Sequence, residues 1–409
     1  MPEATYSHYQ LAQGLDQETA ERAARRNILY YTITKVFNKR VFVPVLVIYF
    51  IDQVGFSIPE IGALAGLYAL VSLVMSMPSG YLADRFGKVL CVRLSAICMV
   101  ASSLIYVFMA NKAGVVTGQL LEAVGFALLI GAAEALVHDS LEVTNRLRDY
   151  SKVLSRAQSV GLIGNAILVA LVPLSYALDP RLPFLIGALA FCVMLFTSFR
   201  MQELIQPSTR PKSARQRVQF AAILRYKWLI VFAILFGIIG AIYYAFDMIT
   251  VALRDFGVPP EHLGWVFSGA SVFGALIGLY VHQLKKLPVG WYMLLDMIIL
   301  MLPFVTALTA NLCFFVPAVV LCVSFWRFRR IIYQDYLLQR YPTRLKATLI
   351  SVMGTTESVN MLWVPVAVAG SVSAFGVQQG LGWVAVAVAV LTIPFVLLGK
   401  SALQKPHKQ

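Results

Sequence analysis

Ionisable side chains stand inside long apolar stretches of this sequence, where a lipid environment would exclude them. A charge at the centre of a membrane helix costs roughly 2.5–3.5 kcal/mol on insertion scales unless it faces a cavity or an opposite charge. Side chains in such positions bind charged substrates, carry protons or pair with one another. In chain order they are Lys35, Lys39, Arg40, Glu122, Glu134, Asp247, Asp296, Arg327, Arg329, Arg330 and Glu357, with His138 and Asp139 at the end of the stretch that holds Glu134.

The basic members of this set could bind an anion. If one helix runs through residues 28–52, Lys35 and Lys39 share one face of it at i and i+4. Together with Arg327 they would make a cavity basic, which favours an anionic or zwitterionic substrate. Six basic and five acidic side chains lie within the stretches, so mutual neutralisation is the alternative. The candidates for lining a substrate cavity are Lys35, Lys39, Arg40, Glu122, Asp247, Arg327 and Asn360.

The acidic members offer sites for a transported proton. Glu357 lies in a polar island, residues 354–360, near the middle of an apolar stretch. Burial favours the protonated form of a carboxyl group and brings proton exchange into the physiological pH range. Glu357 is the first candidate for proton coupling, Asp247 the second and Glu122 the third. Alternatively, Glu357 bonds to neighbouring hydroxyls, or pairs with an arginine of another helix, for packing alone.

The sequence contains no recognisable catalytic or metal-binding constellation. His138 adjoins the carboxylate of Asp139 but lacks a serine or cysteine partner and further ligands. The five cysteines have no paired spacing, so neither a disulfide framework nor a thiolate metal site is expected. No glycine-rich loop followed by Lys and Ser or Thr is present to bind ATP. We therefore expect no enzyme activity, no cofactor and no metal.

The elements that must position these residues are membrane helices. Of the 409 residues, 59% are hydrophobic and only 13% are charged, and the mean hydropathy is +0.74. This composition excludes a soluble globule of this length. About 20 apolar residues cross a bilayer. The sequence holds twelve stretches of that kind, at residues 28–52, 60–82, 89–110, 114–138, 153–176, 183–200, 228–252, 262–283, 289–309, 312–336, 346–370 and 378–398.

Basic residues indicate the orientation in the membrane, because they accumulate in cytoplasmic loops. Most of the 34 Lys and Arg fall on one side of the predicted spans, and Lys112, Arg181 and Arg254 fall on the other. We expect a multi-pass protein of the cell membrane with both termini in the cytoplasm and no cleavable signal peptide. The net charge of +14 then reflects this topology and contact with anionic lipid headgroups rather than nucleic-acid binding.

A polar interval divides the chain into two halves that resemble each other. We predict a tail at residues 1–27, a six-helix half at 28–200, a linker at 201–227, a second six-helix half at 228–398 and a tail at 399–409. The segment from Asp52 to Glu60 matches that from Arg254 to Glu261, at an offset of about 202 residues. Such repeats predict two pseudo-symmetric bundles with the substrate between them. Because one chain supplies both halves, a monomer is expected.

The run from Gly80 to Lys88, G-Y-L-A-D-R-F-G-K, joins the second and third predicted spans. It resembles the loop 2-3 signature of the major facilitator superfamily, G-x-L-a-D-r-x-G-r/k. Gly80 would let two helices approach, and Gly87 would permit the turn. Asp84 would face a helix N-terminus or a cation, while Arg85 and Lys88 would bind lipid phosphates or carboxylates. The resemblance implies an all-α integral membrane protein with twelve transmembrane helices in two six-helix bundles.

The resemblance also implies secondary transport by alternating access, with helices 1, 4, 7 and 10 lining the central cavity. Those are the spans that hold most of the charges, whereas helix 9, with Asp296, lies outside the cavity in this superfamily. A second echo, at an offset of about 196 residues, takes Glu134 to Arg330. These two residues, together with Asp139, are candidates for a cytoplasmic gate that closes when the cavity opens outward. The alternative for Arg330 is that it reaches the lipid headgroups.

The superfamily includes proton-driven drug exporters, but this sequence departs from their motifs at two places, which weakens drug export as an interpretation. Those exporters carry R-x-x-x-G in helix 4, whereas here Leu-Glu-Ala-Val precedes Gly125. They also carry G-P-x-x-G-G in helix 5, where residues 161–166 read G-L-I-G-N-A. We therefore expect a proton-coupled transporter of a small organic anion or amphipathic metabolite, with protons and membrane lipids as further partners. The alternatives are proton-coupled efflux of multiple drugs or toxic compounds and, from another class, a receptor or scaffold that transports nothing.

Overall fold

The chain is almost entirely α-helical, as its composition predicts. The computed structural model describes residues 11–12, 15–205, 227–243, 245–284, 286–340 and 343–403. Within these residues the β-structure is limited to one isolated bridge between Leu11 and Ile205. The predicted all-α membrane fold is thereby confirmed.

The first half of the chain forms helices α1 to α8. Their bounds are α1 Gln17–Phe37, α2 Val43–Asp52, α3 Ile58–Phe86, α4 Lys88–Phe108, α5 Lys112–Leu129, α6 Ala132–Val143, α7 Tyr150–Leu171 and α8 Leu182–Arg200, with the 3-10 turns η1 Leu147–Asp149 and η2 Val172–Ala177 on either side of α7. Helix α1 begins within the predicted tail, and only Gly87 separates α3 from α4.

The second half forms helices α10 to α16. Their bounds are α10 Lys227–Tyr243, α11 Phe246–Asp255, α12 Leu263–Leu284, α13 Val289–Ala307, α14 Leu312–Arg340, α15 Thr343–Asn360 and α16 Val364–Leu403, with the 3-10 turn η4 Pro260–His262 before α12. Helix α16 is kinked at Gly376, whose φ is +78°. The part before this kink belongs to the predicted eleventh span and the part after it to the twelfth.

The described helices are consistent with twelve spans. Nine stretches among the described residues are long and apolar enough to cross a membrane, and one of these, Leu349–Lys400, contains two predicted spans that Gly376 divides. The two predicted spans without a counterpart among the nine, 28–52 and 262–283, correspond to α1 with α2 and to α12.

Three of the four predicted cavity helices are interrupted rather than continuous. The first is broken between α1 and α2, the fourth at Ile130 and Gly131, and the seventh just before α11. In the first break, Pro44 lies in the opening turn of α2. Its ring would clash with the carbonyl of Arg40 in an uninterrupted helix. Lys39 therefore stands on non-helical backbone and does not continue the helical face of Lys35, contrary to the expectation from their spacing.

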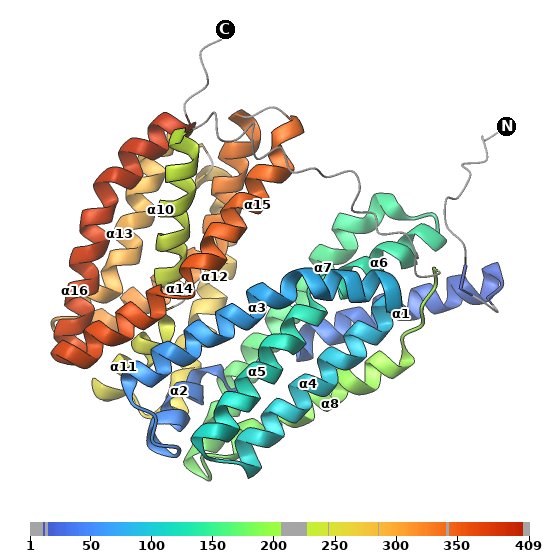
Figure 1. The fold of residues 1–409 in the computed structure, drawn as a ribbon, viewed down its shortest axis with the longest axis horizontal. Helices are drawn as coiled ribbons and strands as arrows, with labels where there is room; N and C mark the ends of the chain where they lie inside the picture. Colours follow the sequence, from blue (N-terminus) through green and yellow to red (C-terminus); the bar gives the residue numbers. More distant parts are fainter. Residues whose placement is uncertain are drawn as a thin grey trace, which may run out of the picture.

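The two halves meet at one end of the molecule. In Figure 1 they converge where α2 and α11 lie, and they diverge toward the end on which both termini lie. Arg254 Nη1 and Asp52 Oδ1 are 2.5 Å apart across this junction. Beside it, α3 packs against the first turns of α16 and the residues just before them. A Cβ on Gly62 would lie 2.6 Å from Ala369 Cβ, and one on Gly66 would lie 2.7 Å from the Leu362 carbonyl oxygen. Such close backbone approach is what glycines in membrane helices permit.

At the opposite end, the start of the predicted linker is attached to the first half. Ala20, Ala23 and Ala24 of α1 pack with Val143 and Leu204 in a small buried cluster. Ala12 N donates to the Leu204 carbonyl oxygen at 3.0 Å. Residues 201–205 therefore lie across the ends of the first-half helices instead of hanging free of them.

Candidate functional site

A cavity of about 770 Å³ lies between the two halves. The first half contributes residues of α2, α3, α5 and α7 and of the break before α2, and the second contributes residues of α11, α12, α14 and the segment around α16. Four charged side chains line it: Lys39, Arg40, Asp247 and Arg327. The apolar lining includes Val43, Leu46, Val47, Phe50, Ile61, Leu64, Phe126, Phe267 and Val323. The cavity is thus an apolar chamber with a few charges, of the size that holds small organic molecules.

Of the four charged lining residues, Arg40 is the one that forms an ion pair among the described residues. Its Nε lies 2.9 Å from Glu122 Oε1, and Glu122 is only 1% exposed. The Tyr106 hydroxyl donates to the other oxygen of Glu122 at 3.1 Å. The Arg40 guanidinium also lies 5.4 Å from the ring of Tyr68. Arg40 is therefore neutralised from behind the cavity wall by a fixed carboxylate.

The other three charges face the cavity without an ion pair among the described residues. Arg327 Nη2 donates to Ser271 Oγ at 2.8 Å, which fixes its direction but leaves its charge unbalanced. Lys39 is exposed to the cavity, and Asp247 lines it from the first turn of α11. Two cations and one anion are consequently available to a ligand.

Three predicted cavity residues do not line this cavity. Glu122 is buried behind Arg40, as described above. Lys35 Nζ lies 3.4 Å from Glu134 Oε1 nearer the diverging end. Asn360 terminates α15, where its Nδ2 donates to the Thr356 carbonyl and its Oδ1 accepts from Trp363 Nε1 at 2.9 Å. Lys39, Arg40, Asp247 and Arg327 are the predicted residues that the fold brings together.

Glu357, the first proton-coupling candidate, lies one helical turn from the cavity. Its side chain is 6% exposed and packs over Gly240 of α10. A Cβ on Gly240 would lie 2.9 Å from Glu357 Oε1. Met361, one turn further along, lines the cavity. Glu357 is therefore buried against α10, one turn away from a residue of the cavity lining.

A buried ion pair in the second half was missed as a site by sequence reasoning. Arg329 Nε and Asp296 Oδ2 are 2.9 Å apart, and both side chains are fully buried. The hydroxyls of Tyr243 and Tyr333 donate to Asp296 at 3.1 and 2.9 Å. The guanidinium lies 4.0 Å from the ring centre of Phe236. The signal in the sequence was the presence of both charges in apolar spans, but their pairing depends on the rotation of α13 against α14.

The candidate gate residues lie apart in this structure. Glu134 is beside Lys35, whereas Arg330 points toward Gly354, where an added Cβ would lie 3.2 Å from its Nη2. Asp139, 6% exposed, binds Lys88 of α4. His138, Asp139 and Glu142 are close enough to share an ion, with their ligand atoms within 4.8 Å. The Lys88 ammonium already forms an ion pair with Asp139, however, and would compete with a metal ion for this carboxylate.

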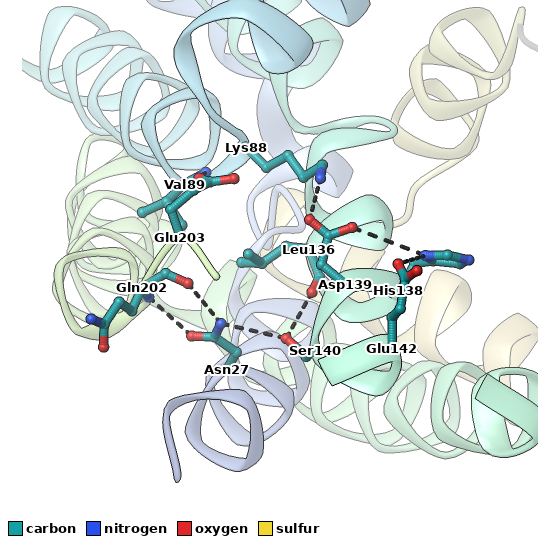
Figure 2. A network of polar contacts seen from close by, with 10 residues as sticks. All are labelled: Asn27, Lys88, Val89, Leu136, His138, Asp139, Ser140, Glu142, Gln202 and Glu203. Atoms are coloured by element: carbon teal, nitrogen blue, oxygen red, sulfur yellow. Dashed lines mark hydrogen bonds and ion pairs between the residues drawn. The ribbon is translucent and has the colours of Figure 1, made fainter. Parts of the chain in front are cut away.

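The loop that carries the signature is held by the start of the linker (Figure 2). Gly87 has φ +104°, so its position suits glycine, whereas Gly80 has no atom near enough to require one. Glu203 accepts a hydrogen bond from Val89 N at 2.9 Å and so occupies the N-terminus of α4. Burial raises the pKa of Glu203 above its usual range. Asp84 and Arg85 are exposed in this structure.

Asn27 attaches the same linker segment to α1. Its Nδ2 donates to the Gln202 carbonyl at 2.9 Å, and its Oδ1 accepts from Gln202 N at 3.0 Å, so the side-chain amide pairs with the backbone as a neighbouring strand would. Figure 2 shows Asn27 between Gln202 and Ser140. Three helices, α1, α4 and α6, are thus joined through residues 202 and 203 and the Lys88 to Asp139 pair.

Comparison with known proteins gives consistent matches. Residues 30–365 match the model of the family described as Major Facilitator Superfamily. The quinolone resistance protein NorA of Staphylococcus aureus strain MRSA252 is 21% identical over 259 residues, which are 62% of this chain and 65% of that protein, slightly under two thirds of its length. NorA of strain MW2 is 20% identical over 290 residues, 67% of this chain and 72% of that protein.

Solved structures share the fold over nearly the whole chain. The nucleoside transporter NupG has a TM-score of 0.75 at 14% identity, and the match covers 92% of this chain and 98% of that one. The POT family transporter PepTSo has a TM-score of 0.73 at 12% identity, with 95% and 99% covered. At these identities the likeness concerns the fold alone.

Proposed function

We propose that this chain, which belongs to the Major Facilitator Superfamily, moves a small organic anion or amphipathic metabolite across the membrane by alternating access, in exchange or symport with protons. It is a multi-pass membrane transporter with a small-molecule substrate. To this we add, as proposals, the substrate class, the proton as coupling ion and the cytoplasmic location of both termini. Because one chain supplies both halves that form the cavity, we propose that the monomer is the functional unit.

The observation that carries the substrate class is the charge state of the cavity. Arg40 is balanced by Glu122, but Lys39 and Arg327 are not balanced by any carboxylate that we find among the described residues. They enter the chamber from opposite halves, and Asp247 is the single carboxylate that the described residues contribute to its lining. An anionic group placed between Lys39 and Arg327 would replace the water that these cations lose when the chamber closes.

A proton site beside the chamber supports the coupling. Glu357 is enclosed, lies one turn from the lining residue Met361, and sits on α15 next to the interrupted segment before α16. A carboxyl group that loses and regains a proton there changes the charge balance of a helix at the interface of the two halves.

Efflux of multiple amphipathic compounds is the second candidate. It is favoured by the similarity to NorA and by the aromatic and aliphatic residues that make up most of the cavity lining. The arginine of the drug-exporter helix 4 pattern is absent, and here the cation beside helix 4 is Arg40, from the break in the first span. A cavity with excess positive charge favours neutral or anionic compounds over cationic drugs.

Proton movement in proteoliposomes tests the proposal. Purified protein is challenged with panels of organic anions, amphipathic drugs and sugars while the internal pH is followed, for the wild type and for Glu357→Gln. An anion should drive proton flux in the wild type, and the Gln variant should bind the anion but lose the flux. Proton flux with drugs alone would establish the second candidate. Absence of any substrate movement would overturn transport of these classes.

Charge removal in the cavity tests the substrate class separately. Lys39→Gln and Arg327→Gln should each raise the half-saturation concentration for the anion by roughly tenfold or more, since a hydrogen bond to a charged group contributes about 1.5–3 kcal/mol. Arg200→Gln is the matched control, because Arg200 lies exposed at the end of α8, away from the cavity lining. Equal effects of all three changes would contradict an anion site between Lys39 and Arg327.

A further inference from the structure

The buried Arg329 to Asp296 pair lies in the core of the second half, not in the substrate cavity. Arg329 comes from α14, Asp296 from α13, and the carbonyl of Phe236 on α10 accepts a hydrogen bond from Arg329 Nη2 at 3.3 Å. Around them stand Tyr243 and Tyr333, which both donate to Asp296. Asp296 thus accepts three hydrogen bonds, all from side chains of the second half.

One nitrogen of Arg329 has no hydrogen-bond partner. Nε binds Asp296 and Nη2 binds the Phe236 carbonyl, but Nη1 is buried and no acceptor for it is found among the described residues. An unsatisfied N–H of a charged group in a membrane protein's core is costly, because neither water nor lipid replaces the missing acceptor. The arrangement calls for an acceptor that takes this nitrogen in some state of the protein.

Glu357 lies against the same turn of α10 as Arg329. The carbonyl of Phe236, which Arg329 contacts, is the helical hydrogen-bond acceptor for the N–H of Gly240. Glu357 packs on Gly240, close enough that a side chain there would collide with its carboxyl group. The two residues therefore approach one turn of α10 from α14 and α15. Arg329 and Arg330, both from α14, are the charged groups that act on Glu357 among the described residues, while α10 presents Gly237 and Gly240 to α15.

We propose that Arg329 is shared between two carboxyl groups: Asp296 holds it at all times, and Glu357 takes the free Nη1 when Glu357 loses its proton. Asp296 is then a positioning residue, because it determines how much of the arginine's charge reaches Glu357 and hence the pH at which Glu357 exchanges its proton. The role of this exchange in transport rests on the proposed function, whereas the sharing of Arg329 does not.

The charges explain why the proton belongs to Glu357 rather than to Asp296. Arg329 supplies one positive charge, which Asp296 already binds, so an ionised Glu357 would depend on the exposed Arg330 for the rest of its balance, and its enclosed carboxyl group keeps a proton. Asp296 receives bonds from two tyrosines and from Arg329, whereas no hydrogen bond to the Glu357 carboxyl group is found among the described residues. The exposed Arg330 reaches α15 near Gly354 and acts on Glu357 from the other side.

Carbodiimide labelling tests the sharing without any transport assay, because dicyclohexylcarbodiimide reacts with protonated carboxyl groups in apolar sites. Purified full-length protein is labelled across a pH series, and the modified fraction of Glu357 is measured by peptide mass spectrometry. In Asp296→Asn the positive charge of Arg329 is no longer balanced and stabilises ionised Glu357. The pH midpoint of labelling should therefore fall by about one to three units relative to the wild type.

A double variant guards against a folding failure of the single one. Asp296→Asn with Arg329→Gln replaces the ion pair by a neutral pair of similar shape, which buried sites tolerate well. Its midpoint should lie above those of the wild type and of Asp296→Asn, since ionised Glu357 can no longer bind Nη1 of the arginine. Asp179→Asn, which removes an exposed carboxylate from a loop of the other half, should leave the midpoint unchanged.

The outcomes separate this inference from the proposed function. The sharing of Arg329 would be overturned if the pH midpoint of Glu357 labelling were the same in the wild type and in the double variant, and also in Asp296→Asn where that variant folds. This conclusion would hold even if Glu357 proved to carry the transported proton. Opposite shifts in the single and double variants would establish the sharing even if substrate moved without protons, in which case only the coupling fails.

Discussion

Asp52 and Arg254 occupy equivalent places in the two halves of the chain and bind each other across the junction between them. They stand 202 positions apart, and Arg254 Nη1 lies 2.5 Å from Asp52 Oδ1. Gly55 and Gly257, at the same offset, both have positive φ, +79° and +104°. The internal repeat seen in the sequence is therefore also a repeat of backbone conformation. Equivalent positions meet where they lie near the pseudo-symmetry axis, so this contact marks the closed end of the molecule.

Linking positions 52 and 254 should hold that end closed. In a background without the native cysteines, Asp52→Cys combined with Arg254→Cys is treated with a short, reducible bifunctional thiol reagent. Substrate flux in proteoliposomes should stop after cross-linking and return after reduction, because the closed end can no longer open. The single-cysteine variants treated in the same way should keep their flux. Undiminished flux in a fully cross-linked sample would show that this end does not open during transport.

Charge reversal at the diverging end tests the predicted gate. Glu134→Arg should impair transport, and adding Arg330→Glu should partly restore it, if the two side chains meet when that end closes. In this structure Glu134 neighbours Lys35 instead, so Glu134→Arg also places two cations together. Glu134→Gln separates these effects, because it removes the gate charge without the repulsion. Independent, additive losses from the two reversals would remove the gate pairing.

Bulk added to the glycines of α3 should force the closed end apart. Gly62→Ala and Gly66→Ala introduce a Cβ within 2.6–2.7 Å of Ala369 Cβ and of the Leu362 backbone, respectively. Overpacking of this kind costs about 1–3 kcal/mol. We expect a lower Tm in detergent and a lower yield of cross-linking between positions 52 and 254. The control is Gly370→Ala, next to Ala369, where an added Cβ meets no atom within 4 Å. A similar loss in the control would contradict overpacking at Gly62 and Gly66, because a change from Gly to Ala by itself favours the helix.

Glu203 should make stability depend on pH through the linker. Its pKa in the folded protein is raised by burial, so its folded form holds a proton more tightly than the unfolded chain does. The stability it contributes is complete below the unfolded value of about 4.3 and is lost as the pH rises through the folded pKa. Glu203→Gln, which still accepts from Val89 N, should therefore gain Tm over the wild type as the pH rises above the unfolded value of about 4.3.

The matching control for Glu203 removes the acceptor altogether. Glu203→Ala leaves the N-terminus of α4 without its partner and should be about 1 kcal/mol less stable than Glu203→Gln at every pH, as loss of a helix cap is. A Gln variant whose Tm follows that of the wild type at all pH values would show that Glu203 does not titrate in this range.

The sequence alone predicted the helical membrane fold, because apolar stretches long enough to span a bilayer are a local property of the chain. It also placed Lys39, Arg40, Asp247 and Arg327 at one cavity, since the positions of cavity helices follow from the superfamily resemblance. The stacking of Lys35 and Lys39 was wrong because the helix ends at Phe37. Pro44 was visible in the sequence, but Pro78 and Pro317 lie inside continuous helices, so a proline alone does not locate a break.

The partners of the buried charges could not be predicted. Arg329 and Arg330 are adjacent in sequence, yet one is fully buried and the other is exposed. Their difference follows from the side of α14 that faces α10 and α13. In the same way, Glu203 rather than Asp84 reaches the N-terminus of α4, because the chain after α8 turns back across the first half. Such choices are set by the rotation and crossing of helices, about which composition and spacing carry little information.

The contact of Gly62 and Gly66 with the segment around Leu362 and Ala369 has a mechanical consequence. It packs glycine backbone directly on the Ala369 methyl group and the Leu362 backbone, with no room for a side chain between them, and dispersion attraction of this kind loses a quarter to a half of its strength over about 0.5–1 Å. The contact therefore resists small displacements of α3 from the residues around Leu362 and Ala369, and its attraction falls away quickly at larger ones. The closed end of the molecule should accordingly open in a two-state manner, with few molecules in intermediate positions.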